Sequence, residues 1–228
     1  MKPTLYQYAA CPFCNKVRTM LQYKGVQFET VEVHPLKKTE LRFSPGYRAV
    51  PIYIDSSGKQ VNDSTPILRH IDKEFPNRRV FTDDAEARVE EARWLNWSEK
   101  FVKGLPTAIY DTLPNALKSF DYVTRVGKFS LWEKWSIKFS GAFVMTLVAR
   151  KIKKREGIED PARFLREEAA EWAAGLGRRP FMGGENPGPA DIAVFGFLRA
   201  IHGLSAEKIL LENAAFTDWR NRMGPRLG

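Results

Sequence analysis

The chain's only two cysteines lie three residues apart, in the motif Cys11-Pro12-Phe13-Cys14. A short apolar strand pattern, residues 4–8, precedes the motif, and a helical pattern follows it. Cys11 is therefore expected at a helix N-terminus, where free backbone N–H groups and the helix dipole favour a thiolate. Pro12 suits the first helical position, because its missing N–H would have no partner there. The pattern predicts Cys11 as a nucleophilic thiol, with Cys14 one turn later as a candidate resolving thiol that points inward.

Two other interpretations of the cysteine pair stay open. The cysteines could be a reduced, buried pair that only packs, or they could be half of a zinc site. A zinc site needs about four ligands, and the three histidines, His34, His70 and His202, show no evident spacing to the motif. We favour the reactive thiol and expect no metal site.

Charge and composition limit the partners and the compartment. The net charge is +9, and residues 1–80 carry 13 Lys and Arg against 7 Asp and Glu. No nucleic-acid motif accompanies this excess, so we expect small anionic ligands first and an anionic membrane surface second. No apolar stretch is long enough to span a bilayer, and no signal-peptide profile opens the sequence. With so few cysteines, we expect a soluble chain in a reducing, cytoplasmic compartment, with peripheral membrane contact as a second option.

The spacing of apolar residues divides the chain into two predicted domains. Residues 1–77 read as a small α/β unit, and residues 82–228 read as helical almost throughout. In the first unit we expect strands at 5–8, 28–33, 50–54 and 60–61, and helices at 15–24, 37–42 and 66–75. In the second we expect helices at 83–101, 131–154, 162–175 and 191–202, with Pro106 and Pro114 breaking the helices of segment 106–120.

Two further motifs lie in the helical half. Gly188-Pro189-Ala190-Asp191 reads as a helix cap in which Asp191 reaches back to backbone N–H groups, and we expect this to serve stability. The basic run 150–155 reads as a solvated helix end. If that run binds a partner, anionic lipid headgroups are the first candidate.

Four separated motifs resemble the soluble glutathione transferase superfamily. They are Cys11-Pro12-Phe13-Cys14, Ala49-Val50-Pro51, Asn62-Asp63-Ser64-Thr65 and the segment from Phe181 to Ile192. Within that superfamily the chain looks most similar to the type-two prostaglandin E synthase family. That similarity also rests on Leu5-Tyr6-Gln7-Tyr8, on Val31-Glu32-Val33 and on the stretch from Tyr47 to Ile52, and it covers nearly the whole chain. The animal members carry an N-terminal hydrophobic anchor, and this chain is expected to start where their soluble part starts.

The resemblance implies a fold and a set of glutathione contacts. The fold would be a thioredoxin-like N-terminal domain followed by an all-helical C-terminal domain. Glutathione would lie at Cys11, Val50, Asp63 and Ser64, with Pro51 following a cis peptide bond. Val50 would pair with the cysteinyl backbone, Asp63 would accept from the α-ammonium group, and Ser64 with its N–H would hold the γ-glutamyl carboxylate.

The resemblance also implies a substrate pocket and an activity. Tyr8 and Phe13 would line a site for a hydrophobic substrate beside Cys11, although Tyr8 could equally be strand core. The activity would be isomerisation of prostaglandin H2 or a related endoperoxide. Haem could bind through the glutathione sulfur, and a homodimer would be usual for the superfamily. The alternatives are a glutaredoxin-like thiol transferase or disulfide reductase, which uses the same Cys11, and a non-catalytic module that binds glutathione or haem.

Overall fold

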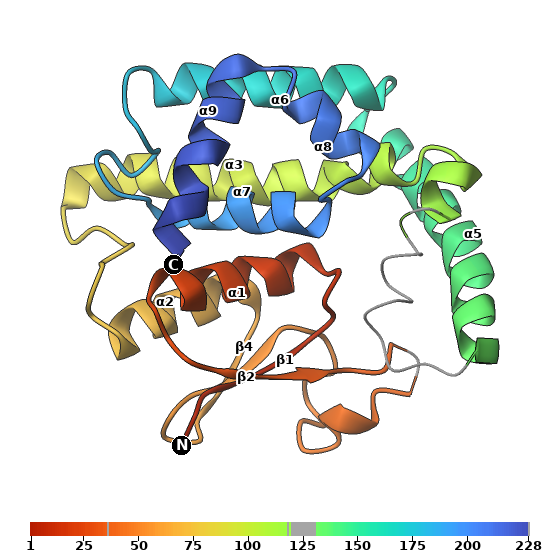
Figure 1. The fold of residues 1–228 in the computed structure, drawn as a ribbon, viewed down its shortest axis with the longest axis horizontal. Helices are drawn as coiled ribbons and strands as arrows, with labels where there is room; N and C mark the ends of the chain where they lie inside the picture. Colours follow the sequence, from red (N-terminus) through yellow and green to blue (C-terminus); the bar gives the residue numbers. More distant parts are fainter. Residues whose placement is uncertain (36, 118, 120–130, 228) are drawn as a thin grey trace. The chain divides into compact units, whose positions relative to one another are not determined.

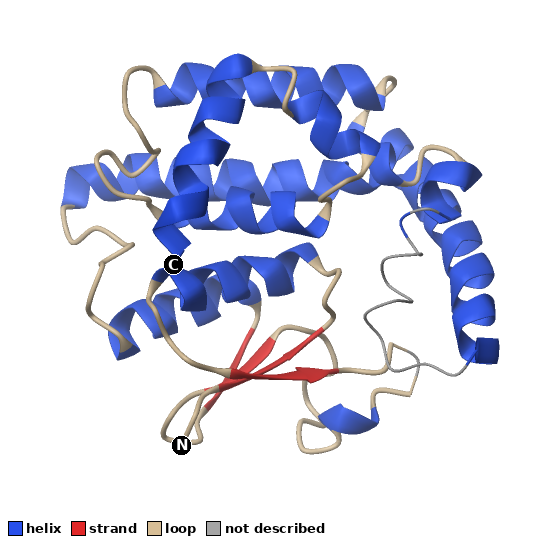
Figure 2. Cartoon of the chain, in the orientation of Figure 1, coloured by secondary structure: helices blue, strands red, loops and turns tan. Residues whose placement is uncertain are grey.

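The computed structural model describes residues 1–35, 37–117, 119 and 131–227, except for the side chains of residues 131–138. A four-stranded sheet in the order β2-β1-β3-β4 organises the N-terminal part (Figure 2). Its strands are β1 (Thr4–Gln7), β2 (Glu29–Glu32), β3 (Ile52–Ile54) and β4 (Gln60–Asn62). β1 pairs with β2 in parallel, whereas β3 runs antiparallel to both β1 and β4. This is the predicted crossover followed by a hairpin.

Two helices cover the sheet and a third short element follows β2. α1 (Pro12–Tyr23) and α2 (Ser64–Glu74) contact each other and lie side by side over the sheet in Figure 1. The apolar stripe that predicted α1 is fully buried, at Val17, Met20 and Leu21. The helix expected at 37–42 is instead a single 3-10 turn, η1 (Thr39–Leu41), which places Leu41 in the core. Helix α2 begins two residues before the predicted start, because Asp63 caps it.

The remainder of the described chain is helical. Its helices are α3 (Ala85–Ile109), α5 (Leu131–Glu156), α6 (Pro161–Leu176), α7 (Pro189–Ala200), α8 (Ser205–Leu210) and α9 (Ala214–Met223), followed by the 3-10 turn η2 (Gly224–Leu227). The predicted fold class, a thioredoxin-like domain followed by an all-helical domain, is therefore confirmed.

One predicted helix break is in a different place. Pro106 lies inside α3, which continues to Ile109, and the helical backbone is interrupted only at residues 110–112. Buried Val102, Leu105 and Ala108 continue the apolar stripe across the proline, and their burial offsets the lost hydrogen bond. Residues 118 and 120 of the predicted 106–120 segment lie outside the described residues.

Packing divides the chain into two compact units that each combine separate segments. The first comprises Met1–Leu95, Pro180–Ala200 and Asn221–Gly228, and the second comprises Asn96–Arg179 and Ile201–Arg220. α7 joins the first unit because it packs along α1: a Cβ at Gly196 would lie 2.6 Å from the Lys16 backbone. The domain boundary that the sequence predicts between residues 77 and 82 stays a prediction.

No helix among the described residues is long and apolar enough to cross a membrane.

The core of the second unit is built around a cluster of aromatic rings. Trp172 is fully buried and contacts Trp97, Phe216 and Trp219, with ring centroids between 4.8 and 6.5 Å apart.

Candidate thiol site

Cys11 is the N-cap residue of α1, as the sequence predicted. Its backbone is extended, its N–H donates to the Tyr8 carbonyl at 3.0 Å, and its carbonyl accepts from Asn15 N at 2.9 Å. Cys11 is partly exposed, whereas Cys14 is fully buried, and both thiols are free. The helix therefore presents one sulfur at its open N-terminus and holds the other one turn inside.

The surroundings shift the pKa values of the two thiols in opposite directions. A hydrogen bond from the Cys14 thiol lowers the pKa of Cys11, and the backbone N–H groups of Phe13 and Cys14 and the charge of Arg18 act with it against the effect of burial. Burial raises the pKa of Cys14 well above its usual range, and the Cys11 hydrogen bond and charge add to it. The arrangement favours a thiolate on Cys11 and a neutral thiol on Cys14.

The sheet register brings the other predicted glutathione contacts to the same edge. Tyr6 pairs with Ile52, and Ile52 pairs with Asn62, so continuing the strands past these residues leads to Tyr8, Val50 and Asp63. Tyr8 and Val50 also pack against one apolar cluster, formed by Val33, Leu41 and Ile52. The Val50–Pro51 peptide bond is cis, as the family resemblance implied.

Asp63 and Ser64 form the N-terminus of α2. Asp63 has a positive φ of 69°, and its carboxylate accepts from Ser64 N at 2.6 Å. Ser64 is buried and has 2% of its surface exposed. Its N–H, expected to hold a carboxylate, is thus already occupied by Asp63. A ligand carboxylate at this helix start would depend on the Ser64 hydroxyl and on the next N–H groups of the helix.

Three aromatic residues surround the thiol. Burial raises the pKa of Tyr8 to about 12, and the charges of both cysteines contribute to the shift. Tyr47, which the sequence did not single out as a site residue, also has a raised pKa, caused by burial and by Asp63 and the two cysteines. Tyr47 therefore faces both the α2 cap and the thiols. Phe13 lies edge-on to Phe197 of α7, with the ring centroids 6.1 Å apart.

Sequence reasoning missed three polar residues that hold the loop before Cys11. The side chains of these residues, Asn15, Arg18 and Glu32, all form hydrogen bonds with the Ala9 backbone. Asn15 is four residues after Cys11 and so lies on the same helix face, a spacing that could have indicated it. Glu32 is on β2, and only the pairing of β2 with β1 brings it to this loop.

A cluster of titratable groups on the hairpin side of the same unit serves the fold. Asp55, His70 and Glu74 offer ligand atoms within 4.8 Å of one another. Their oxygens are already bound: Asp55 accepts from His70 at 2.8 Å and from Ser57, and Glu74 accepts from Tyr53 and Ser56. The cluster therefore fastens the β3–β4 turn to α2.

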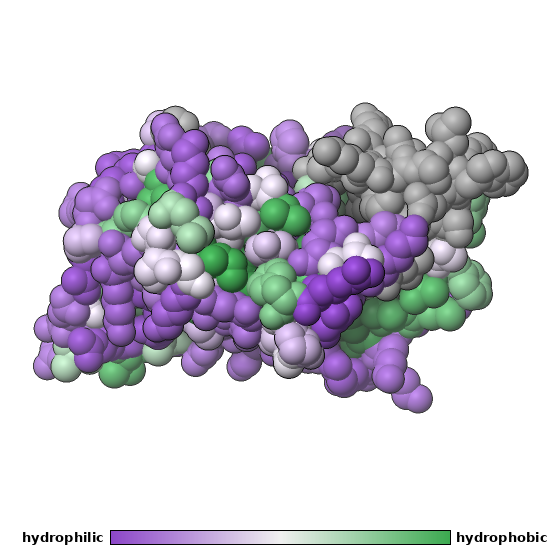
Figure 3. All heavy atoms as spheres, turned by 90° about the horizontal axis from the view of Figure 1, so that it is seen from below, coloured by the Kyte–Doolittle hydropathy of each residue, from purple (hydrophilic) through white to green (hydrophobic). Residues whose placement is uncertain are grey.

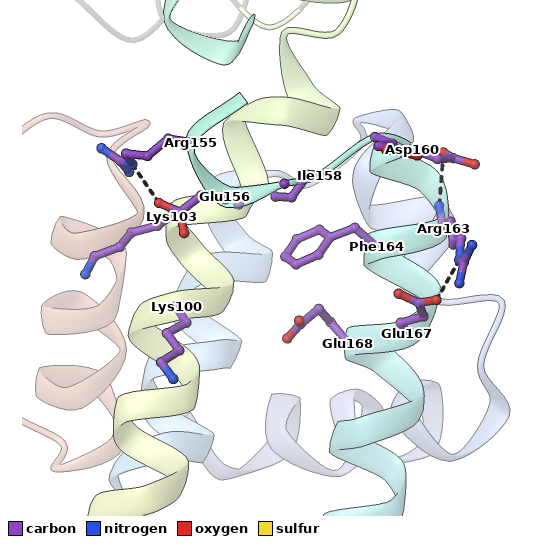
Figure 4. Close-up of a pocket in the computed structure, with 13 residues that line it drawn as sticks. Lys100, Lys103, Arg155, Glu156, Ile158, Asp160, Arg163, Phe164, Glu167 and Glu168 are labelled. Carbon is purple, nitrogen blue, oxygen red and sulfur yellow. Dashed lines mark hydrogen bonds and ion pairs between the residues drawn. The ribbon is translucent and has the colours of Figure 1, made fainter. Parts of the chain in front are cut away.

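The second unit has a polar pocket of about 950 Å³, which none of the predicted site residues lines (Figure 4). Phe164 and Glu168 of α6 point into it toward α3, which contributes Lys100 and Lys103 to the lining. Arg163 pairs with Glu167 at 2.7 Å across its rim. Burial and the charges of Glu171 and Glu167 raise the pKa of Glu168 to about 7. The pocket is therefore lined mostly by charged side chains, and among the described residues no cysteine, serine, threonine or histidine lines it.

Comparisons with known proteins agree with the family resemblance seen in the sequence. A family model for the glutathione S-transferase N-terminal domain matches residues 5–79. Prostaglandin E synthase 2 from Mus musculus is 34% identical over 265 residues, covering 96% of this chain and 69% of the relative. The Danio rerio protein of the same name is 34% identical over 266 residues, covering 98% and 70%.

Solved structures agree on the fold. Rice glutathione transferase 1 in complex with glutathione superposes with a TM-score of 0.61 at 20% identity, over 98% of this chain and 86% of the rice chain. The β-etherase LigF from Sphingobium superposes with a TM-score of 0.65 at 18% identity, over 100% and 97%. At these identities the likeness concerns the fold alone.

Proposed function

Because the chain belongs to the prostaglandin E synthase 2 family within the glutathione transferase superfamily, we propose that it is a glutathione-dependent isomerase that opens an endoperoxide at Cys11. The substrate would be prostaglandin H2 or a related cyclic peroxide. The observation that carries the proposal is the contrast between two neighbouring thiols. Cys11 is the partly exposed N-cap of α1, where its surroundings lower its pKa, whereas Cys14 is buried, and burial raises its pKa.

Glutathione would lie along the sheet edge that carries Tyr8, Val50 and Asp63. The Val50 backbone would pair with the cysteinyl residue in the manner of an added strand, next to Pro51. The Asp63 carboxylate would accept from the α-ammonium group. The γ-glutamyl carboxylate would meet the Ser64 hydroxyl at the start of α2, where the helix dipole favours an anion.

The isomerisation balances without any oxidant or reductant. The Cys11 thiolate attacks one endoperoxide oxygen, so an S–O bond forms and the O–O bond breaks. The other oxygen leaves as an alkoxide and takes a proton to become the alcohol. Loss of the proton from the carbon that carries the sulfur-bound oxygen then forms the carbonyl, breaks the S–O bond and returns the thiolate.

Tyr8 and Phe13 would complete the substrate side of the site. With a pKa of about 12, the Tyr8 phenol stays protonated at neutral pH and can donate a hydrogen bond to the peroxide oxygen that gains charge. Phe13 would supply an apolar surface for the substrate, next to the ring of Phe197.

The test is conversion of prostaglandin H2 in the presence of glutathione, with products separated by mass spectrometry. The wild type should form the keto-alcohol faster than the spontaneous reaction does, and Cys11→Ser should return the rate to that background. Cys14→Ser should keep most of the activity, because a serine hydroxyl can still donate to the Cys11 sulfur. Full activity in Cys11→Ser would refute the thiol mechanism.

The hydrogen bond between Cys14 and Cys11 favours a second candidate, a glutathione-dependent thiol transferase. In that reaction the Cys11 thiolate takes the glutathionyl group from a mixed disulfide and releases the substrate thiol; Cys14 or a second glutathione then resolves the new disulfide. Turnover of a small glutathione mixed disulfide, lost in Cys11→Ser, with no prostaglandin product, would select it. Both activities need reduced thiols, so we place the chain in a reducing, cytoplasmic compartment.

Haem would join this site only through the glutathione sulfur. A haem held in this way needs no histidine of the protein as a ligand. A Soret band that appears only when haem and glutathione are added together would support the complex. The same band with no turnover of peroxide or disulfide would indicate a non-catalytic binding module.

We also propose that the chain forms a homodimer through α5. Five large apolar side chains on this helix are between 37% and 60% exposed: Phe139, Phe143, Val144, Leu147 and Val148. Figure 3 shows hydrophobic residues gathered at its right-hand side, where α5 lies in Figure 1. Their spacing places them along one helix face, and such a patch marks an interaction surface.

Light scattering after size exclusion tests the dimer. The wild type should elute with twice the chain mass, and Phe143→Glu should elute as a monomer, while the exposed control Glu171→Gln should not change the mass. The basic residues 150–155 follow the same helix, so the alternative occupant is an anionic membrane. A monomeric wild type that sediments with phosphatidylserine vesicles would replace the dimer by peripheral membrane contact.

A further inference from the structure

Three side chains form hydrogen bonds with the backbone N–H and C=O of Ala9, two residues before Cys11. Glu32 accepts from Ala9 N at 2.8 Å, and the Ala9 carbonyl accepts from both Asn15 and Arg18 at 2.9 Å. Asn15 also donates to the Cys11 carbonyl at 3.0 Å. We call Glu32, Asn15 and Arg18 the Ala9 brace. Its members come from β2 and from two successive turns of α1, so they fix the loop that carries the thiol relative to both elements.

The Ala9 brace lies in a buried place, and one of its hydrogen-bond donors has no partner among the described residues. Ala9 and Asn15 are 4% and 2% exposed, and the Arg18 guanidinium donates from Nη2 to both the Ala9 carbonyl and the Asn15 side chain. The Arg18 Nε atom is buried and has no hydrogen-bond partner among the described residues. An unsatisfied buried donor destabilises the folded chain. A neutral side chain could hold one carbonyl without that cost, so the position calls for a reason to keep a cation.

Position and charge together supply that reason. The hydrogen bond from Cys14 lowers the pKa of Cys11 most, and the positive charge of Arg18 acts in the same direction on Cys11 and also on Cys14, where burial outweighs it. Glu32, the acidic member, has a pKa raised by burial, and Arg18 partly opposes this. The brace therefore places a permanent positive charge near the thiols and a weaker acid on the other side of the loop.

We propose that Arg18 is a positioning residue for the Cys11 thiolate: through Asn15 and the Ala9 carbonyl it fixes the loop that presents the sulfur, and its cation favours the charged form. This inference rests on the proposed role of Cys11. It goes further by assigning the thiol's state to a residue that need not contact glutathione or substrate.

Other titratable groups lie around the thiols and Tyr8 and must be distinguished from Arg18. Cys14 lies on the same helix, Tyr8 ends β1, and Glu32 comes from β2. Glu40 acts on Tyr8 from η1, and Tyr47 faces the thiols from the segment before β3, under the influence of Asp63. Arg18 is the group in this set that carries a positive charge, so its removal should raise the pKa of Cys11, whereas removal of an acidic neighbour should lower it. Loss of the Cys14 hydrogen bond would also raise the pKa of Cys11, and the charge-keeping variant Arg18→Lys separates the two effects.

The experiment is the pH dependence of Cys11 alkylation by iodoacetamide, read by mass spectrometry on the full chain without glutathione. Arg18→Gln should move the midpoint upward by about one pH unit, so that the rate below both midpoints falls roughly tenfold. Arg18→Lys should keep most of the wild-type midpoint, because it keeps the charge. Glu32→Gln should move the midpoint downward. Arg88→Gln, at a position with an exposed side chain, removes the same charge and should leave the midpoint unchanged.

Three results would overturn the inference. One is an Arg18→Gln midpoint equal to that of the wild type in a folded protein. Another is an equal shift in Arg88→Gln, which would assign the effect to net charge. A loss of plateau rate in both Arg18→Lys and Arg18→Gln with no shift would assign Arg18 to structure alone. A wild-type Cys11 that resists alkylation at every pH would instead refute the proposed function itself.

Discussion

At the residue scale, one helical turn separates two identical side chains into different chemical states. Cys11 ends an extended loop and meets free N–H groups, whereas Cys14 sits inside the sheet–helix interface with no exposed surface. The difference in reactivity between the two thiols therefore follows from their places in the helix and from their burial. We expect iodoacetamide at pH 7 to label Cys11 at least tenfold faster than Cys14, as measured by peptide mass spectrometry. Equal labelling of a folded sample would contradict this.

The α2 cap makes a second residue-scale prediction. Asp63 satisfies Ser64 N and is proposed to accept from the glutathione ammonium group, so Asp63→Ala removes a cap and a counter-charge together. We expect a loss of about 1 kcal/mol in unfolding free energy and at least a tenfold weaker glutathione affinity by calorimetry. Asp63→Asn can keep the cap but lacks the charge, so it should weaken binding with little change in stability. Unchanged affinity in both variants would remove Asp63 from the glutathione site.

At the element scale, the start of α7 depends on one buried carboxylate. Asp191 has no exposed surface and accepts from Gly188 N at 2.8 Å, Met182 N at 2.9 Å and Gly183 N at 3.0 Å. Asp191→Ala should therefore cost about 3 kcal/mol or more, since two buried N–H groups and one partly buried N–H group lose their acceptor. Urea unfolding measures it, and Asp218→Ala, at an exposed position on α9, serves as a control for loss of an aspartate. A cost below 1 kcal/mol would show that the loop finds other acceptors.

The same helix shows what local pattern could and could not predict. The sequence Gly188-Pro189-Ala190-Asp191 predicted the cap and the acceptor role of Asp191, because both depend on residues three apart. The long-range contacts of Asp191 with Met182 and Gly183 follow from how the preceding loop folds back. The contact of Gly196 with the Lys16 backbone joins segments 180 residues apart in sequence, and no local spacing encodes it.

The candidate site shows the same division. Cys11 and Asp63 belong to short motifs in which a helix N-cap is a local physical reason, whereas the cis bond before Pro51 was implied only by the family resemblance. Glu32 reads only as part of an alternating strand, and its bond to Ala9 exists because β2 pairs in parallel with β1. The Pro106 prediction was wrong because burial along α3 outweighed a local rule.

At the scale of the whole molecule, the dependence of stability on pH combines groups from both units. Asp55 has a pKa lowered to about 2: burial, which would raise it, is outweighed by hydrogen bonds from Ser57, Lys59 and His70. Its contribution to stability is therefore present above pH 4 and is lost as the pH falls toward 2. Glu168 acts in the opposite sense, since its pKa is raised to about 7. The folded chain holds that proton more tightly than the unfolded chain, so stability declines as the pH rises from about 4.5 to 7.

Removing the Glu168 charge should therefore stabilise the protein only where that charge exists. We expect Glu168→Gln to raise the unfolding free energy at pH 8 by about 1 kcal/mol, after allowance for solvent screening of a partly exposed group, and the melting temperature by roughly 2–4 °C. At pH 5 the carboxyl is already protonated in the folded chain, so the variant should match the wild type. Differential scanning calorimetry at both pH values measures the contrast, with Glu185→Gln, at an exposed position away from Glu168, as the control. An equal gain at both pH values would show that packing of the amide against Phe164, and not the charge, is responsible.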